Sequence, residues 1–241
     1  MLIASNIHKS FDDKHVLNGI DLTIKPGEIT CAIGPSGTGK TTLLRALGCL
    51  DYPDQGSVEI DGQSYNFPLQ DGANVPQPWP QMTVVFQSLF LWPHLTLREN
   101  IMLPARNHNP DAEKDIEGLA EIFDMKHFID KFPNEGSIGQ RQRVALVRAL
   151  MLNPTYILMD EITSALDVEQ TARILTKFIH LKEREIGVFL ITHELGFARK
   201  AADHIVFMDE GKIVEQGAPS ILKDPQTERL KGFLDMASEI L

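Results

Sequence analysis

Five short apolar runs are spaced along the chain, and segments with helical periodicity lie between several of them. The runs are nearly continuous rather than alternating, which is typical of strands buried on both faces of a sheet. They cover residues 29–33, 82–86, 156–159, 188–192 and 204–208. Helices are expected over residues 41–49 and 168–182, each following one of these runs. Strands that alternate with helices predict an α/β fold with a mostly parallel sheet.

The middle of the chain departs from this alternation. Residues from about 93 to 153 carry helical patterns without an obvious strand, so we expect an inserted helical subdomain. Residues 63–81 are rich in Pro, Gly, Gln and Asn, and we expect a surface excursion between strands there. The predicted boundaries are a core at about 1–87 and 154–241 and a subdomain at about 88–153, within a single domain over 1–241.

The composition is that of an ordinary globular protein, with 43% hydrophobic residues and a formal net charge of −10. This charge argues against a large nucleic-acid-binding surface, which needs clustered Lys and Arg. Cys31 and Cys49 lie in apolar surroundings without metal-ligand spacing, so both are expected to be reduced core residues. We find neither a signal peptide nor an apolar run of the roughly 18–20 residues that a membrane-spanning helix requires. A cytoplasmic location is expected, and any work at a membrane would depend on a partner.

The strongest local motif is a glycine-rich loop, GPSGTGKT, over residues 34–41. It matches a phosphate-binding loop, and it lies between a predicted strand and a predicted helix, as that loop requires. The glycines allow a tight turn with inward N–H groups, and the helix N-terminus adds positive partial charge. Lys40 would reach the β and γ phosphates, and the Thr41 hydroxyl would ligate Mg²⁺. The alternative is a glycine-rich turn with an incidental lysine, which the flanking strand and helix disfavour.

Two carboxylates end the apolar run at residues 156–159. Asp160 and Glu161 would point to opposite faces of an extended strand, but a turn at the strand end would bring both to the ligand crevice. Asp160 suits the Mg²⁺ shell, and Glu161 suits a general base for the attacking water. Taken alone, the pair is weak evidence, because many strands end in Asp for turn reasons.

Together with other short motifs, these residues resemble the nucleotide-binding domains of ABC transporters over nearly the whole chain. Gln87 in VVFQS resembles the Q-loop glutamine, and Ser137-Ile138-Gly139-Gln140 resembles the signature motif. Residues 164–167 resemble the D-loop, and His193 in ITHE resembles the switch histidine. Taken by itself, a histidine after an apolar strand such as His193 is more often a capping or core residue than a catalytic one.

The resemblance implies a P-loop NTPase (RecA-like) core, a small N-terminal antiparallel sheet and a helical subdomain. It implies ATP and Mg²⁺ as ligands, with catalytic roles for Glu161, His193 and Gln87 and metal contacts by Thr41, Gln87 and Asp160. It also implies a head-to-tail pair of such domains, in which the signature of one copy meets the phosphate loop of the other. The implied nucleotide contacts are Phe11, Val16, Gly34, Pro35, Ser36, Gly37, Thr38, Gly39, Lys40, Thr41, Thr42, Ser137, Gly139 and Gln140.

The sequence departs from the family at the signature, where LSGGQ is usual. Gly136 and Ile138 replace two of these five residues, while Ser137 remains suited to cap a helix. Ile138 is β-branched and Gly136 adds backbone freedom, so we hypothesise a working site with weakened dimer closure. Ile162 also stands where the family usually has Pro, which would change turn stiffness rather than chemistry.

Residues 89–93, within SLFLWPHLT, border the region that docks on a membrane permease in this family. The aromatic cluster there could instead be subdomain core. The resemblance is strongest to subunits that import polar amino acids, working at the inner face of the cell membrane. An exporter, a lipoprotein-release or cell-division complex and a soluble iron–sulfur assembly ATPase remain alternatives, while nucleic-acid partners are disfavoured.

Overall fold

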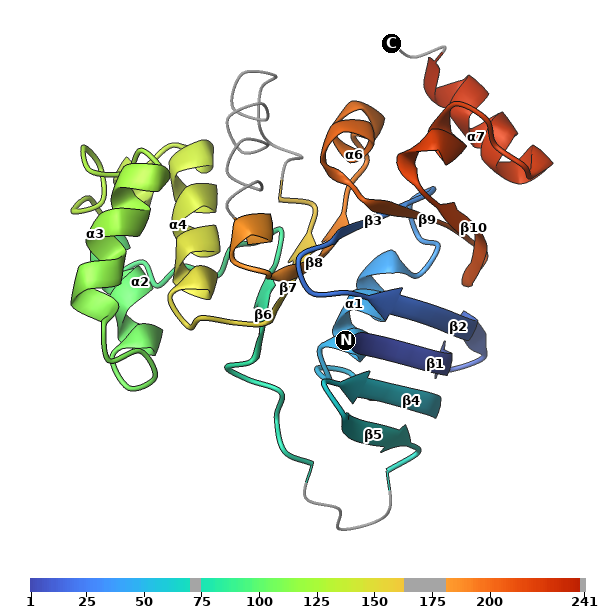
Figure 1. Ribbon diagram of the computed structural model, residues 1–241, viewed down its shortest axis with the longest axis horizontal. Helices are drawn as coiled ribbons and strands as arrows, with labels where there is room; N and C mark the ends of the chain where they lie inside the picture. Colours follow the sequence, from blue (N-terminus) through green and yellow to red (C-terminus); the bar gives the residue numbers. More distant parts are fainter. Residues whose placement is uncertain (70–74, 163–180, 239–241) are drawn as a thin grey trace.

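The computed structural model describes residues 1–69, 75–162 and 181–238, which form two sheets flanked by helices (Figure 1). A six-stranded sheet has the order β10-β9-β3-β8-β7-β6, and a four-stranded antiparallel sheet has the order β2-β1-β4-β5. The larger sheet consists of β3 (Ile29–Ile33), β6 (Met82–Val85), β7 (Tyr156–Asp160), β8 (Gly187–Ile191), β9 (His204–Asp209) and β10 (Lys212–Gly217). All five predicted runs form its strands, so the expected α/β fold with a mostly parallel sheet is confirmed.

Every adjacent pair among β9, β3, β8, β7 and β6 is parallel. Strand β10 pairs antiparallel with β9. The near-continuous apolar character of the strands follows from burial on both faces. In β7, Ile157 and Met159 belong to one apolar cluster, while Tyr156 and Leu158 belong to the other. Side chains alternate between the two faces of a strand, so β7 is covered on both faces of the sheet and its positions before Asp160 are apolar.

The antiparallel sheet contains β1 (Leu2–Phe11), β2 (Lys14–Ile24), β4 (Gln55–Ile60) and β5 (Gln63–Phe67). The expectation of a surface excursion over 63–81 is wrong for its first residues, which form the edge strand β5. Tyr65 and Phe67 are buried while their neighbours are exposed, so a two-residue apolar period is present although polar residues surround it. Tyr65 lies opposite Val58 and Phe67 lies opposite Gly56 in the antiparallel pairing with β4.

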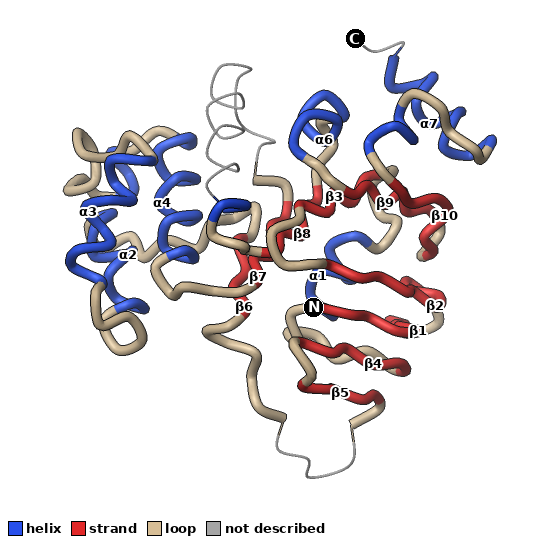
Figure 2. Tube along the Cα trace, viewed as in Figure 1, coloured by secondary structure: helices blue, strands red, loops and turns tan. Residues whose placement is uncertain are grey.

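Helices cover the larger sheet on both sides. They are α1 (Lys40–Leu47), α2 (Leu97–Ala105), α3 (Ala112–Ile122), the short 3₁₀ helix η1 (Pro133–Glu135), α4 (Ile138–Leu150), α6 (Leu195–Ala201), the short η2 (Pro219–Leu222) and α7 (Glu228–Ser238). In the view of Figure 2, α2, α3 and α4 lie on the opposite side of the larger sheet from the antiparallel sheet. These three helices lie in sequence between β6 and β7, where helices were predicted, and the exact division into core and subdomain remains a prediction.

The first helix is shorter than the predicted 41–49. It ends at Leu47 because Gly48 caps it and Cys49 takes a left-handed backbone conformation with φ 52°. Both cysteines are free and buried, as expected, and burial raises the pKa of Cys31 to about 12 and that of Cys49 to about 11. Most of the predicted helix 168–182 lies outside the described residues. Within the described residues, none of the helices has the length and apolar character needed to cross a membrane.

Candidate functional site

Four predicted site segments meet at one edge of the parallel sheet. The glycine-rich loop follows β3, Gln87 follows β6, Glu161 follows β7 and His193 follows β8. These strands are neighbours in the order β3-β8-β7-β6, and they are parallel, so their carboxyl ends share an edge. Parallel α/β sheets place their ligand crevice outside this edge. The topology thus brings together residues that are up to 159 positions apart, from Gly34 to His193.

The glycine-rich loop has a geometry that only glycine permits at two positions. Gly34 has φ 140°, and a Cβ there would lie 2.1 Å from the carbonyl oxygen of Met208. Gly39 has φ 99°, and a Cβ there would lie 2.7 Å from the carbonyl oxygen of Val16. Side chains at either position would need the neighbouring strand backbone to move, so the loop is held close against it.

This loop surrounds a cavity of about 200 Å³ at the start of α1. Lys40 is almost fully buried, and its Nζ donates hydrogen bonds to the carbonyl oxygens of Gly34 at 2.8 Å and Pro35 at 2.7 Å. Burial lowers the pKa of Lys40, and the nearby carboxylates of Glu161 and Asp160 act in the opposite direction. The cavity is lined by Val16, Ser36, Gly37, Gly39, Lys40, Thr41, Thr42 and Glu161.

The predicted metal ligands Thr41 and Asp160 lie together. The Thr41 hydroxyl donates to Asp160 Oδ1 at 3.3 Å, and Asp160 is 7% exposed. Burial raises the pKa of Asp160, and Glu161 raises it further, while the Thr41 hydrogen bond, Lys40 and His193 lower it. A buried carboxylate beside a hydroxyl and a second carboxylate is an all-oxygen donor set of the kind that Mg²⁺ takes. The residues present therefore fit a nucleotide phosphate with Mg²⁺.

Glu161 turns the chain immediately after β7, as the sequence argument required. Its φ is 50°, a left-handed conformation that is costly for a side chain with a Cβ. The backbone N–H of Glu161 donates to the carbonyl oxygen of Ile191 at 3.0 Å. Its carboxylate lines the same cavity as Lys40 and contacts His193 through Oε1 and the ring Nε2. The turn therefore joins an acidic group and an imidazole at the edge of the cavity.

A second cavity, of about 480 Å³, adjoins Asp160. It is lined by Arg45, Leu50, Phe86, Gln87, Ser88, Phe90 and Asp160. Gln87 and Asp160 thus face one space, although they come from different strands. Sequence reasoning missed Arg45 here, because its position depends on which face of α1 is turned toward β7, and no local motif marks that face.

The signature residues lie away from both cavities. Ser137 caps α4: its hydroxyl accepts a hydrogen bond from the N–H of Gln140 at 3.2 Å, and the Gln140 side chain accepts from the N–H of Ser137 at 2.9 Å. The predicted cap is therefore confirmed. Among the described residues that line the two cavities, none belongs to α4. Ser137, Gly139 and Gln140 are thus not brought to Lys40 within one copy.

The two departures in the signature have little effect on its backbone. Gly136 has φ −91° and ψ 142°, an extended conformation open to any residue, and a Cβ there would make only ordinary contacts from 3.6 Å. Ile138 occupies the first turn of α4 with its side chain 46% exposed. The change at Ile138 is therefore one of surface chemistry rather than of fold.

Two further residues predicted to contact the nucleotide lie in different surroundings. Val16 lines the loop cavity, and its contact with the nucleotide stays a prediction, whereas Phe11 ends β1, is 49% exposed and has its ring centroid 5.5 Å from Lys9 Nζ. Phe11 is not among the described residues that line the cavity, so its contact with a base stays a prediction. The predicted D-loop, residues 164–167, lies outside the described residues.

Comparisons with known proteins agree on one family. The family model described as ABC transporter matches residues 17–164. The chain is 40% identical over 247 residues to the probable amino-acid import ATP-binding protein YxeO of Bacillus subtilis, covering 99% of this chain and 98% of the relative. It is also 40% identical over 243 residues to the glutamine transport ATP-binding protein GlnQ of Escherichia coli, covering 99% of this chain and 100% of the relative.

A solved structure with the same fold is the dimeric post-hydrolysis state of the ATP-binding cassette MJ0796 bound to ADP and Pi. It superimposes with a TM-score of 0.77 at 30% sequence identity, covering 91% of this chain and 99% of that chain. The family model covers more than half of the chain, and the relatives match along nearly their whole length. The chain therefore belongs to the ABC transporter family, and it is an ATPase domain of that family.

Proposed function

We propose that this chain binds ATP with Mg²⁺ and hydrolyses it to drive the import of amino acids or similar small solutes through a separate membrane permease. One observation carries the chemical part of this proposal: Lys40, Asp160, Glu161 and His193 meet at the carboxyl edge of neighbouring parallel strands. The names of the relatives YxeO and GlnQ support the import of amino acids.

The proposed ATP hydrolysis uses charged and oxygen-bearing side chains that lie at the cavity. ATP with Mg²⁺, when bound, supplies a γ-phosphoryl group that can be transferred to water. Lys40 places a cation beside the glycine-rich loop, where backbone N–H groups also favour phosphate oxygens. Asp160 and Thr41 provide oxygen ligands for the cation, with Gln87 on the adjoining cavity. The Glu161 carboxylate accepts a proton from water, and His193 holds that carboxylate in place.

The active unit is a pair of these domains arranged head to tail. The helix start at Ser137 is solvent-accessible and lies apart from the cavity in its own copy, so its hydroxyl and the positive end of α4 are available to a phosphate held by a second copy. The dimeric state of the similar cassette MJ0796 supports the pairing of two such domains. The proposed pair is a homodimer, in which each copy of this chain contributes one set of the motifs.

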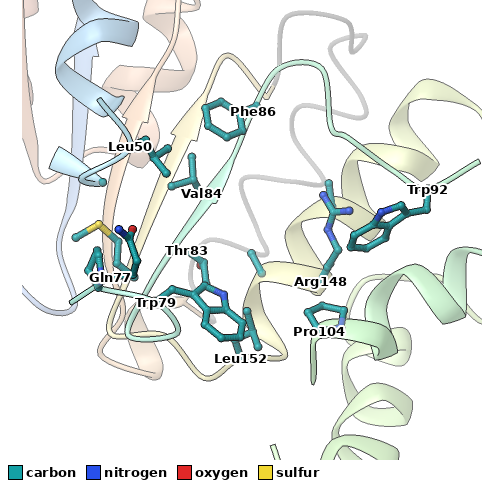
Figure 3. Close-up of a pocket in the computed structure, with 15 residues that line it drawn as sticks. Leu50, Gln77, Trp79, Thr83, Val84, Phe86, Trp92, Pro104, Arg148 and Leu152 are labelled. Atoms are coloured by element: carbon teal, nitrogen blue, oxygen red, sulfur yellow. The ribbon is translucent and has the colours of Figure 1, made fainter. Parts of the chain in front are cut away.

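The permease contact is placed at a groove lined by β6 and α4 (Figure 3). The predicted docking segment 89–93 divides between two roles. Leu89 and Leu91 pack against the core, whereas Phe90 is 65% and Trp92 is 38% exposed. The groove holds a cavity of about 260 Å³ between Trp79 and Trp92. Exposed aromatic side chains around an apolar hollow suit a partner segment of the permease at the inner face of the membrane.

Purification of the intact complex tests the function. We expect a multi-spanning permease to co-purify with the tagged native chain and to stimulate ATP hydrolysis when the transported amino acid and its binding protein are supplied. A soluble scaffold in place of a permease would contradict the proposal and favour an assembly ATPase. Stimulation in the absence of external solute would favour an exporter.

The docking surface is tested by Trp92→Ala, with Met236→Ala as the control because Met236 is an exposed apolar residue on α7. We expect Trp92→Ala to lose the co-purifying permease while ATP affinity and the melting temperature stay near native. Met236→Ala should keep the permease. A large fall in the melting temperature with Trp92→Ala would instead assign this aromatic residue to the core.

A further inference from the structure

Arg148, near the end of α4, reaches the segment that follows Gln87. Its Nη1 donates to the carbonyl oxygen of Phe90 at 2.8 Å, and its Nη2 donates to that of Leu89 at 2.6 Å. The guanidinium lies over the Trp92 ring, 5.3 Å from the ring centroid, as Figure 3 illustrates. Two parallel N–H donors and a stacked ring fix the plane of the guanidinium.

The environment of Arg148 is unusual for a cation. Burial lowers its pKa, and within the described residues no carboxylate lies at ion-pair distance from it. Among the described residues, the half-buried charge is therefore compensated by carbonyl oxygens and an aromatic face rather than by an ion pair. Such an arrangement ties the side chain to the geometry of one backbone segment.

That backbone segment is strained. Leu89 has φ 58° and Phe90 has φ 45°, so two successive residues with a Cβ are in the left-handed region. The N–H of Leu89 donates to Phe86 O at 2.9 Å, and the N–H of Phe90 donates to Ser88 O at 2.7 Å, which closes a tight turn around Gln87. Strained backbone of this kind persists only when surrounding contacts hold it. The two hydrogen bonds from Arg148 are among the contacts that hold this segment in its strained conformation.

The same helix carries the signature at its other end. Ser137 caps α4 and Arg148 lies eleven positions later, roughly 16 Å along the axis at the usual helical rise. One hydrogen-bonded helix of 13 residues, α4, joins these two ends without a break. A shift of its N-terminus is therefore passed to the turn that directs Gln87 toward the cavity shared with Asp160.

We propose that Arg148 is a positioning residue that ties the orientation of Gln87 to the position of α4. When a second copy of this chain contacts the N-terminus of α4 at Ser137, α4 takes a fixed position. The hydrogen bonds of Arg148 then pass this change of position to the turn at Leu89 and Phe90. This inference rests on the proposed role of Gln87 in hydrolysis. It adds to that role a means by which partner engagement controls the Gln87 side chain.

The chain offers a matched control on the same helix. Arg143 donates from Nη1 to the carbonyl oxygens of Phe123 at 3.0 Å and Asp124 at 3.2 Å. It also stacks over an aromatic ring, that of Phe128, at 4.8 Å. These contacts lie at residues 123–128, beyond the end of α3, and Arg143 Nε also donates to the carbonyl oxygen of Gly139 at 3.4 Å. Loss of Arg143 therefore removes comparable carbonyl and aromatic contacts from α4, and these contacts do not involve Leu89 or Phe90.

The test compares Arg148→Met, Arg148→Lys and Arg143→Met, each alone and combined with Gln87→Ala. We expect Arg148→Met to lower kcat about tenfold while the dissociation constant for ATP stays near native. Arg148→Lys should recover only part of kcat, because an ammonium cannot make two parallel bonds in one plane. In the Gln87→Ala background, Arg148→Met should cause little further loss, because both changes remove the same contribution.

A readout independent of turnover comes from Trp92. The chain has two tryptophans, so Trp79→Phe leaves Trp92 as the sole indole reporter beside the guanidinium. In that background we expect ATP to change the Trp92 emission of native and Arg143→Met protein, and the change to be absent in Arg148→Met. Melting temperatures of all variants report whether folding is intact, and Arg148→Lys carries the comparison if Arg148→Met unfolds.

The outcomes distinguish the positioning role of Arg148 from the proposed role of Gln87 in hydrolysis. Fully multiplicative losses of kcat for Arg148→Met and Gln87→Ala, or an ATP-dependent Trp92 signal that survives Arg148→Met, would overturn the positioning role alone. The positioning role would also be overturned if Arg143→Met and Arg148→Met gave the same coupling with Gln87→Ala in kcat. Full turnover in Gln87→Ala would instead remove the role of Gln87 from the proposed function, and the inference with it.

Discussion

The carboxyl edge of the parallel sheet and the N-terminus of α4 both carry predicted nucleotide contacts, yet they are built differently. At the sheet edge, Lys40 and Asp160 are buried and hydrogen-bonded to residues from other segments. At α4, Ser137 is exposed and Gln140 is half-buried, and each side chain accepts a hydrogen bond from the backbone N–H of the other in the capping box. The fold preorganises the first region. The second region is a capped helix N-terminus at the surface, and its proposed ligand is held by another copy of the chain.

On the proposed head-to-tail arrangement, one chain would hold the phosphate-binding residues, and a second copy would complete the active site. Changes at the sheet edge should therefore act within each copy, on binding or on chemistry. Changes at the α4 end should act on the association of two copies. The following predictions test that division, beginning with the largest effect.

Glu161→Gln should lower turnover by roughly 100- to 10,000-fold, because it removes the proton acceptor at the cavity. ATP binding should persist, and the ATP-bound dimer should accumulate. Steady-state hydrolysis and size-exclusion chromatography with ATP measure the two effects. Glu185→Gln is a matched control, since Glu185 is also acidic and left-handed, with φ 57°, but lies before β8. Unchanged turnover in Glu161→Gln would refute the assignment.

Lys40→Ala should weaken ATP binding by about 1.5–3 kcal/mol, because it removes a charged hydrogen-bond donor from the cavity. Isothermal titration calorimetry with ATP and Mg²⁺ provides the measurement. Lys25→Ala removes an exposed lysine that pairs with Glu28, and it should leave the affinity unchanged. Equal affinities for native and Lys40→Ala protein would mean that the loop binds phosphate without this side chain.

Asp160→Asn should raise the melting temperature of the nucleotide-free protein at neutral pH while weakening its response to Mg²⁺. Burial raises the pKa of Asp160 in the folded state, so folding favours the protonated carboxyl, and the ionised form at higher pH costs stability. The difference in melting temperature between variant and native should therefore grow as the pH rises above the ordinary carboxyl pKa. A difference that shrinks with rising pH would show that Asp160 is stabilised as a carboxylate.

Gly136→Leu combined with Ile138→Gly should raise turnover by up to tenfold, or about 1.4 kcal/mol. The gain is expected only where two copies associate, because neither residue touches the cavity. Turnover measured across a range of protein concentrations separates association from chemistry. Gly136→Ala alone serves as the control, since the extended backbone accepts a Cβ without strain. No gain at any concentration would end the hypothesis of weakened closure.

The sheet edge was the more predictable of the two regions. The glycine-rich loop and the acid pair follow apolar strands, and parallel topology then forces Lys40 and Asp160 together. The cap at Ser137 could also be predicted, because it depends on residues three positions apart. Sequence therefore predicts features that are local or that follow from sheet topology.

Other features could not be predicted because they join distant segments without a local pattern. Gly34 is held against the carbonyl of Met208, and Arg148 bonds carbonyls 58 and 59 positions earlier. Strand β5 was missed for another reason, since only Tyr65 and Phe67 carry its apolar face among polar neighbours. Backbone carbonyls are present in every residue, so nothing in the sequence marks those that serve as partners.

The left-handed backbone at Glu161 has a consequence for protein engineering. Residues with a Cβ pay about 1–2 kcal/mol in this region, whereas glycine does not. Selection of variants for heat tolerance alone would thus reward glycine at position 161, and the most robust clones would be inactive ones. A screen for stabilised forms of this protein must therefore measure ATP turnover as well as heat resistance, because heat resistance alone would select against Glu161.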